Sequence, residues 1–408
     1  MSATNRGKIM EPLVFKGAYA EAHVYAVQLE PCAVDQIYTF LNCPAFEGAK
    51  IRIMPDCHAG SGAVIGFTAP VGDKIIPNVI GVDIGCGVVM ARDNGWLVRT
   101  LRDGDALGFA NIDRIIREKV PSGFRHRESP YQFLGAVFDA TIEQHHGADL
   151  KAFWRDLEAV AAKIGQPIQK VMNQLGTLGG GNHFIEVDRN KIGRLGLTVH
   201  SGSRNFGLRV AEYHQKKAQD IMAGGNRRND LAWLEGADAQ EYLADMRVAQ
   251  VFARLNRMAI LDAIMMEIGG SVRTVETIES IHNFIGDDGI IRKGAVSARK
   301  GEPVIIPWNM RDGLIVGVGK GNVDWNNSAP HGSGRRMSRG EARRSLSVDE
   351  FSADMVEAGV WSSCVGSETI DEAPGAYKPT DEILSVIGET VEIMDSFKPV
   401  FNFKAGKE

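Results

Sequence analysis

The chain has 408 residues, of which 44% are hydrophobic and 24% charged, so it is a globular protein rather than a disordered or fibrous one. The net charge of −5 excludes a wholly basic surface, and nucleic acid could bind only at a local patch. Five irregularly spaced cysteines, no apolar signal segment and no long apolar run favour a cytoplasmic protein without membrane contact.

Strand-like segments joined by glycine-rich turns lie between residues 49 and 92. Polar residues stand at their ends. Asp56 follows the first segment, and Asp83 and Cys86 precede the last. We therefore expect short strands that deliver side chains capable of chemistry into one site.

Helical and strand-like patterns alternate along the rest of the chain. Residues 133–175 and 239–268 have apolar positions at helical spacing, and residues 182–200 and 272–319 have β character. Residues 380–397 are predicted to be a helix that precedes a final strand at 400–403. Because the elements are interleaved, we expect one α+β domain covering residues 1–408.

Several residues that can bind a transition metal stand beside glycine, asparagine or serine. Glycine lets a backbone approach a metal or a phosphate closely. Taken singly, each of these residues is more often structural, because buried cysteines and hydrogen-bonded histidines are common. Together they predict a mixed site for Zn, Mn, Fe or Co, with enough ligands for two ions. The candidates are Asp83, Cys86, His183, His200 and His282.

A basic segment follows His331. Charge runs of this kind are usually solvated helix faces, but a neighbouring histidine between glycine-rich stretches favours phosphate binding. Ser338 and Glu341 form a capping-box pattern, which predicts that a helix begins there. The arginines are Arg335, Arg336, Arg339, Arg343 and Arg344.

These motifs resemble those of the RtcB family of RNA-splicing ligases, which are GTP- and Mn-dependent enzymes. The resemblance begins at Met54-Pro55-Asp56-x-His58-x-Gly60-x-Gly62 and extends to the C-terminal strand. The longest matching motifs are Gly81-Val82-Asp83-Ile84-Gly85-Cys86-Gly87, Leu175-Gly176-Thr177-Leu178-Gly179-x-Gly181-Asn182-His183-Phe184-x-Glu186, His200-Ser201-Gly202-Ser203-Arg204 and Arg292-Lys293-Gly294-Ala295-Val296.

The resemblance implies a single domain with β-sheets around a central site for two Mn²⁺ ions and helices outside. The implied ligands are Asp83, Cys86, His183, His200 and His282, with Cys86 bridging. His331 would take GMP from GTP, supported by Asp56. Arg204 and Arg335 would hold phosphates. The implied nucleotide contacts are Asn182, Glu186, Asn309, His331, Gly332, Ser333, Gly334, Tyr377 and Lys404.

The implied activity joins RNA 2′,3′-cyclic phosphate or 3′-phosphate ends to 5′-hydroxyl ends, in RNA repair or tRNA splicing. It proceeds through histidine–GMP and RNA-3′-pp-5′-G intermediates, with an archease-like activator as a further expected partner. Three alternatives stay open from the residues alone: a metal-dependent phosphohydrolase, a non-catalytic RNA-binding protein, and an enzyme that caps ends without sealing them.

Some positions differ from the family pattern. Asn309 stands where the family has a serine, Ser333 replaces an alanine, and Phe284 replaces a tyrosine. Residues 324–330, just before His331, are also unusual. The chain is therefore interpreted as a divergent paralogue that keeps every candidate ligand and the candidate nucleophile.

Overall fold

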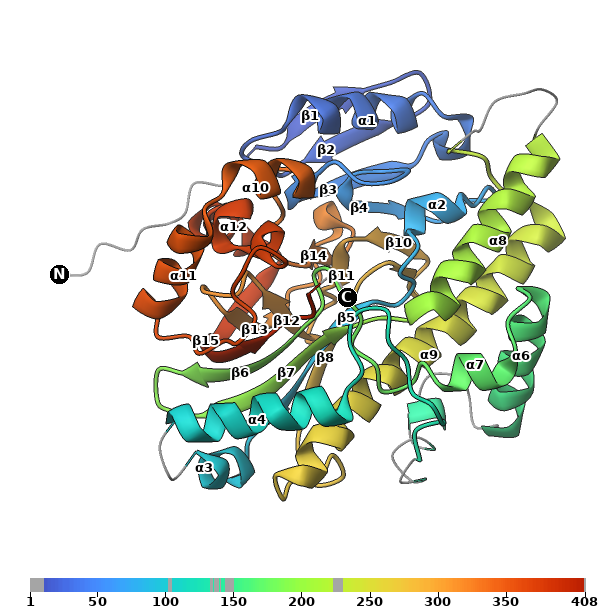
Figure 1. The fold of residues 1–408 in the computed structure, drawn as a ribbon. Coiled ribbons are helices and arrows are strands. Elements are labelled where there is room, and N and C mark those ends of the chain that lie inside the picture. Colours follow the sequence, from blue (N-terminus) through green and yellow to red (C-terminus); the bar gives the residue numbers. More distant parts are fainter. Residues whose placement is uncertain are drawn as a thin grey trace.

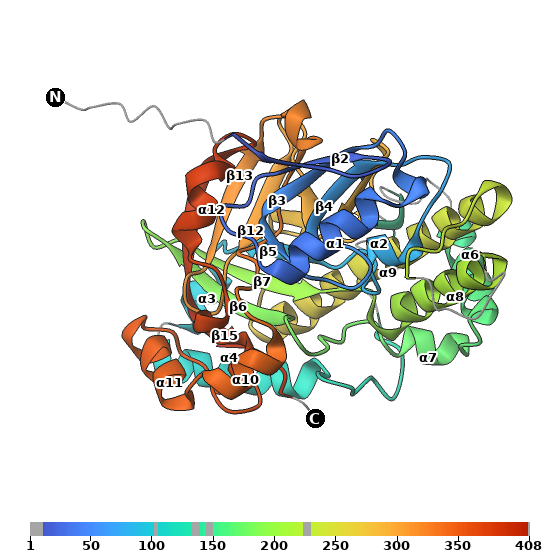
Figure 2. The same ribbon diagram turned by 90° about the horizontal axis from the view of Figure 1, so that it is seen from above.

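The computed structural model describes residues 11–101, 105–132, 135, 139, 141–143, 150–222 and 230–406. Figures 1 and 2 show two β-sheets in the middle of the molecule and helices around them. The sheets are mostly antiparallel, and runs of strands and helices follow one another along the chain, which confirms the predicted α+β class.

One sheet is built mainly from the N-terminal part of the chain. Its neighbouring strands pair antiparallel except β2 and β3, which are parallel. β3 carries Asp56 within the strand, whereas the sequence placed Asp56 after it, because pairing with β4 continues to His58. In spatial order the strands are β1 (Leu13–Lys16), β2 (Glu21–Val24), β3 (Lys50–His58), β4 (Ile65–Pro70), β10 (Ile290–Lys293) and β9 (Phe284–Ile285).

The other large sheet is antiparallel and strongly curled. Its outermost strands approach each other, since the backbone N–H of Ile305 on one donates to Ser280 Oγ on the other over 2.9 Å. A separate pair, β11 (Ala295–Ser297) and β14 (Ser328–Pro330), lies beside it. In spatial order the curled sheet contains β12 (Pro303–Pro307), β13 (Leu314–Gly319), β15 (Val391–Phe403), β6 (Phe184–Asn190), β7 (Leu195–Ser201), β5 (Gly87–Arg92) and β8 (Thr277–Ile281).

The helices cover the outside of these sheets (Figure 1). They are α1 (Pro31–Leu41), α2 (Pro77–Ile80), α3 (Trp96–Thr100), α4 (Asp105–Lys119), α6 (Leu150–Lys163), α7 (Ile168–Met172), α8 (Arg204–Met222), α9 (Gly236–Glu267), α10 (Arg339–Ser345), α11 (Val348–Glu357) and α12 (Thr380–Ile387). Short 3₁₀ turns lie at η1 (Pro44–Phe46), η2 (Val323–Trp325), η3 (Ile370–Glu372) and η4 (Pro374–Ala376). Among the described residues, no helix is both long and apolar enough to cross a bilayer.

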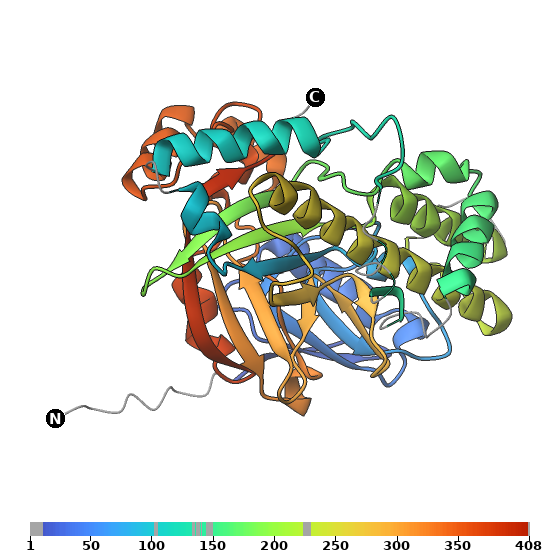
Figure 3. The ribbon, with the colours of Figure 1, turned by 90° about the horizontal axis from the view of Figure 1, so that it is seen from below.

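The long helix α9 packs against one face of the curled sheet. It packs on β5 and β7 and contacts α4, α6 and α8, and Figure 3 shows it lying across the strands. Most of its side chains are buried, as expected for a helix that is apolar around much of its circumference. β7 is buried along its whole length, so the middle of the curled sheet is covered on both faces.

Several predicted elements agree with the structure. The helix predicted over 239–268 is α9, and the capping box begins α10, where Ser338 Oγ accepts the N–H of Glu341 at 3.2 Å. The helical pattern predicted over 133–175 is divided where it is described, into α6 and α7, because Gly165 has φ +68° and Pro167 follows.

The helix predicted over 380–397 is wrong in its second half. α12 ends at Ile387, and β15 begins at Val391 rather than at residue 400. From Val391 to Phe397 this segment pairs with β13, and from Phe397 to Phe403 it pairs with β6. Inter-strand hydrogen bonds over this length outweigh the local apolar spacing that suggested a helix.

Candidate metal and nucleotide site

Four neighbouring strands of the curled sheet bring side chains to the same end of the sheet, where the strands start or stop. Gly87 at the start of β5 pairs with Ser201 and Ile281, the last residues of β7 and β8, and Phe184 at the start of β6 pairs with His200. Antiparallel neighbours run in opposite directions, so two starts and two ends meet there. Cys86, His183, His200 and His282 occupy these positions.

The possible metal-donor atoms at these strand ends lie close together. Cys86 Sγ lies 3.4 Å from His183 Nε2 and 3.3 Å from His200 Nε2. His200 Nε2 is 3.4 Å from His282 Nε2, and Asp83 Oδ2 is 3.0 Å from His183 Nε2. Two overlapping groups, one of Cys86, His200 and His282 and one of Asp83, Cys86 and His183, each keep their donor atoms within 4.8 Å. Cys86 belongs to both groups.

Backbone carbonyls orient two of the imidazoles. His183 Nδ1 lies 2.9 Å from the carbonyl oxygen of Leu178, and His200 Nδ1 lies 3.1 Å from that of Asn182. A carbonyl can only accept, so Nδ1 donates and Nε2 presents its lone pair to the cluster. Burial lowers the pKa of His200 and His282 well below the usual range, which leaves both neutral. Neutral imidazoles with a carboxylate and a thiol are a donor set that fits a transition metal.

Burial disfavours ionisation of both acidic donors, but their pKa values shift in opposite directions overall. Burial raises the pKa of the Cys86 thiol well above its usual value, and Asp83 raises it further. For Asp83, burial opposes ionisation, but its contact with His183 and the charge of Arg204 hold its pKa below the usual range. A cation would compensate a thiolate here, so metal binding would release the thiol proton.

Glycines allow the close approach that this geometry needs. A Cβ added to Gly202 would lie 2.1 Å from Asp83 Oδ1. At Gly334, whose φ is +73°, a Cβ would lie 2.2 Å from the carbonyl oxygen of Asp56. Side chains at these two positions would push the acidic residues out of place.

The candidate nucleophile stands between the two large sheets. His331 follows β14, and its Nδ1 lies 2.6 Å from Oδ2 of Asp56 on β3. The backbone N–H of His331 donates to the same oxygen at 3.1 Å. Asp56 is fully buried, whereas the His331 side chain is 17% exposed. A carboxylate on Nδ1 leaves Nε2 with a lone pair for attack on an electrophile. The ring centres of His331 and His282 are 4.8 Å apart, so this nitrogen serves the same site as the metal cluster.

A cavity of about 590 Å³ connects the candidate nucleophile, the cluster and the predicted nucleotide contacts. Its size suits a ligand as large as a nucleotide. It is lined by Asp83, Cys86, His200 and His282 and by Asn182, Glu186, Asn309, His331, Gly332, Ser333, Gly334, Tyr377 and Lys404.

Asn309 is mostly engaged within its own turn. Its Oδ1 accepts the backbone N–H groups of Arg311 and Asp312, both at 3.0 Å, and its Nδ2 donates to Asp312 Oδ2 at 2.7 Å. An asparagine side chain has two lone pairs and two N–H groups for strong bonds. One N–H therefore remains for a ligand, so Asn309 contributes to shape more than to hydrogen bonding.

Glu372, which the sequence did not suggest, ties the predicted contacts together. Its Oε2 accepts from Tyr377 Oη at 2.5 Å and from Lys404 Nζ at 3.1 Å, and its Oε1 accepts from Arg335 at 3.3 Å and from Arg339. Burial raises its pKa, but the charges of Lys404, Arg339 and Arg335 outweigh burial and lower the pKa to about 2. The related signal in the sequence is the arginine-rich segment 335–344, of which Arg335 and Arg339 pair with Glu372 in the fold.

The two predicted phosphate-binding arginines lie in different surroundings. Arg335 lines the nucleotide cavity, whereas Arg204 lines a neighbouring cavity of about 800 Å³. Arg204 has φ +58°, its Nε donates to Thr177 Oγ1 at 3.3 Å, and one terminal nitrogen lies 3.2 Å from His183 Nδ1. Because His183 Nδ1 donates its proton to Leu178, the Arg204 contact with this nitrogen is not a hydrogen bond, and Arg204 acts on the cluster through its charge beside Asp83.

Comparisons with known proteins cover nearly the whole chain. A family model described as tRNA-splicing ligase RtcB matches residues 36–405. The RNA-splicing ligase RtcB of Escherichia coli (strain K12) is 31% identical, over 96% of this chain and 98% of that protein. The tRNA-splicing ligase RtcB of Nanoarchaeum equitans is 28% identical, over 85% of this chain and 86% of that protein. The RNA-splicing ligase RtcB2 of E. coli (strain ATCC 25922) is 26% identical, over 92% of this chain and 93% of that protein.

Proposed function

The chain belongs to the RtcB family, and from this premise we propose that it is an RNA ligase dependent on GTP and Mn²⁺. It joins a 2′,3′-cyclic phosphate or 3′-phosphate end to a 5′-hydroxyl end, in RNA repair or tRNA splicing. Residues 1–408 are proposed to form one ligase domain, because the candidate site residues come from both large sheets and from residues 56 to 331 of the chain.

The observation that carries this proposal is the Asp56–His331 pair beside the metal-binding cluster in one cavity. Asp56 holds the Nδ1 proton, so Nε2 of His331 can attack the α-phosphorus of GTP. A phosphorus–nitrogen bond forms, the bond to the β-phosphate oxygen breaks, and pyrophosphate leaves. Two Mn²⁺ ions held by Asp83, Cys86, His183, His200 and His282 would neutralise charge on the reacting phosphates.

The later steps use the same residues. Water opens a cyclic phosphate end to a 3′-phosphate, whose oxygen attacks the phosphorus of histidine–GMP and displaces His331. The 5′-hydroxyl then attacks the 3′-phosphorus, and GMP leaves as the strand is sealed. Arg335, Tyr377 and Lys404, joined through Glu372, would hold the guanine nucleotide or its phosphates during these steps.

The test is covalent labelling with α-labelled GTP and Mn²⁺, followed by a denaturing gel. We expect label on the wild type and on His23→Ala, a histidine variant outside the cavity, but not on His331→Ala. An RNA with a 3′-phosphate and a partner with a 5′-hydroxyl should then be joined by the wild type. Absence of label from metal-loaded wild type would reject the ligase and favour a phosphohydrolase. Label without joining would indicate capping.

A further inference from the structure

The larger cavity of about 800 Å³ is not used by the reaction steps above. It adjoins the nucleotide cavity, because Asp83, Arg339 and Glu372 line both. Its other walls come from distant segments: the loop after α4, helix α7, the start of α8, helix α10 and the C-terminal residues. Figure 1 shows the loop after α4 and the C-terminus on the same side of the molecule.

Phe124 stands on the wall of this cavity with its ring in solvent. Its side chain is 90% exposed, more than any other large hydrophobic residue in the described ranges. Burying so exposed a phenyl ring against a partner would be favourable, because its apolar surface would leave water. An aromatic partner that stacks on the ring would cover this surface.

The loop that carries Phe124 is anchored on both sides. The backbone N–H of Gly123 donates to the carbonyl of Gly179 at 3.0 Å, and that of Arg127 donates to Asn173 at 2.9 Å. Both acceptors belong to the segment that leads into His183. These bonds fix the backbone that carries Phe124 relative to the segment of the metal-binding cluster.

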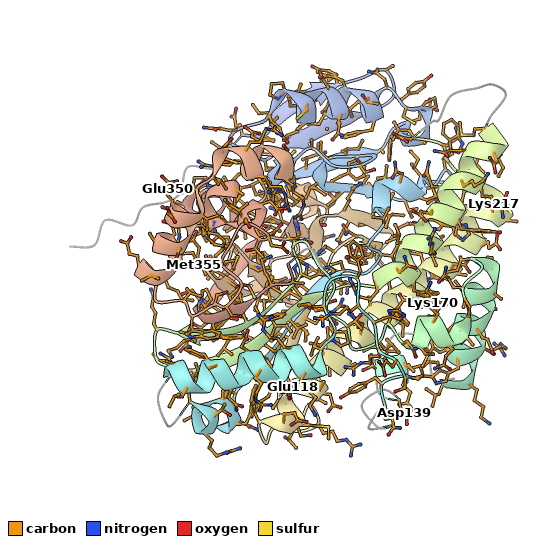
Figure 4. All side chains as sticks on the ribbon, in the orientation of Figure 1. Glu118, Asp139, Lys170, Lys217, Glu350 and Met355 are labelled. Atoms are coloured by element: carbon orange, nitrogen blue, oxygen red, sulfur yellow. The ribbon has the colours of Figure 1, made fainter. Side chains whose placement is uncertain are left out.

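Basic side chains line the same cavity as the ring. They are Arg125, Lys170 and Arg209, in addition to Arg339 and Arg343 of α10. Lys170 on α7 is exposed (Figure 4) and makes no ion pair with any described residue. Four acidic residues also line the cavity. Asp371 and Glu372 are paired with Arg339 and Arg343, Asp83 belongs to the metal-binding cluster, and Glu368 is exposed. An aromatic face with nearby cations is the combination that binds single-stranded nucleic acid.

We propose that this cavity binds an unpaired stretch of RNA next to the reacting end, with Phe124 stacked on a base and Lys170 on a backbone phosphate. This inference rests on the proposed function. Stacking on a protein ring requires a base that has left its own helix. The enzyme should therefore prefer breaks flanked by unpaired nucleotides over breaks in a continuous duplex.

The test measures RNA affinity without GTP, by fluorescence anisotropy of a labelled single-stranded RNA with a 3′-phosphate. Phe124→Ala should weaken binding by about 5- to 100-fold, and Phe124→Trp should restore it, since base stacking on an aromatic ring has that magnitude. Lys170→Ala should weaken binding and reduce the salt dependence by about one counterion. Leu107→Ala removes another exposed apolar side chain, outside the cavity, and should bind as the wild type does.

A second measurement identifies stacking itself. An RNA with an abasic nucleotide near its 3′ end should lose affinity for the wild type but lose little more with Phe124→Ala, because both changes remove one contact. Unchanged affinity of Phe124→Ala, or fully additive losses, would overturn the inference. Covalent labelling of the wild type with GTP is measured in a separate assay, so that failure of the ligase proposal can be told from failure of the RNA site. Binding that depends on Phe124 without GTP labelling would reject the ligase and keep the RNA site.

Discussion

Asp56 is the residue on which the chemistry of His331 depends. Its Oδ2 receives both the ring and the backbone N–H of His331, whereas its buried Oδ1 has no hydrogen-bond partner in the described part of the chain. The carboxylate is thus directed at one imidazole. It selects the tautomer with a proton on Nδ1 and stabilises positive charge that develops on the ring.

Asp56→Asn should slow labelling by GTP by about 100-fold or more, because the amide cannot supply that charge. The rate of adduct formation, measured with α-labelled GTP, checks this, and bound Mn²⁺ should stay at the wild-type level. Cys57→Ala is the matched control, since Cys57 is a buried neighbour on β3 that packs in the apolar core. A wild-type labelling rate in Asp56→Asn would remove Asp56 from the mechanism.

At the scale of elements, β6 carries two buried carboxylates on one face. Glu186 and Asp188 are two residues apart, and Asp188 is fully buried with Oδ2 accepting from Thr198 Oγ1 at 2.5 Å. Burial raises the pKa of Asp188 to about 7, although the Thr198 hydrogen bond opposes this rise. Burial and the charge of Asp188 also raise the pKa of Glu186.

This pair predicts how stability changes with pH. The native state holds the Asp188 proton more tightly than the unfolded chain does, so the free energy of unfolding should fall as pH rises from about 4 to about 7. Asp188→Asn should flatten this dependence and exceed the wild type in stability at pH 8, by on the order of 1–3 kcal/mol. Urea unfolding at several pH values checks it, with the exposed Asp35→Asn as control. An unchanged slope in Asp188→Asn would contradict the assignment.

At the scale of the whole molecule, the metal cluster joins segments that are far apart in the chain. Its candidate ligands come from the turn after α2 and from the ends of β6, β7 and β8. An ion that binds this arrangement and not the unfolded chain stabilises the fold in proportion to its concentration over Kd.

The metal-free protein should therefore melt several degrees below the protein in saturating Mn²⁺. Cys86→Ala should fold, bind less Mn²⁺, lose activity and show no such shift, as measured by thermal scanning and metal analysis. Cys43→Ala, another buried cysteine in the apolar core, should lose some stability but keep the response. Full Mn²⁺ content in Cys86→Ala would show that Cys86 is not a bridging ligand.

The sequence by itself determined the α+β class, the position of α9 and the residue types of the candidate site. These are local properties, because helical periodicity lies within one segment and each candidate ligand belongs to a short motif that contains glycine, asparagine or serine. Local spacing also contained α8, where buried Phe206, Val210, His214 and Ala218 recur every four residues, yet it was not predicted.

Tertiary structure alone decided which of these groups meet. Asp56 and His331 are 275 residues apart in the chain and join two sheets, and Glu372 gathers Arg335, Tyr377 and Lys404 without any motif of its own. The same holds for β15, whose strand conformation comes from pairing with β13 and β6, and for the exposure of Phe124. Strand register and burial depend on contacts between distant segments, and no local pattern of residues contains them.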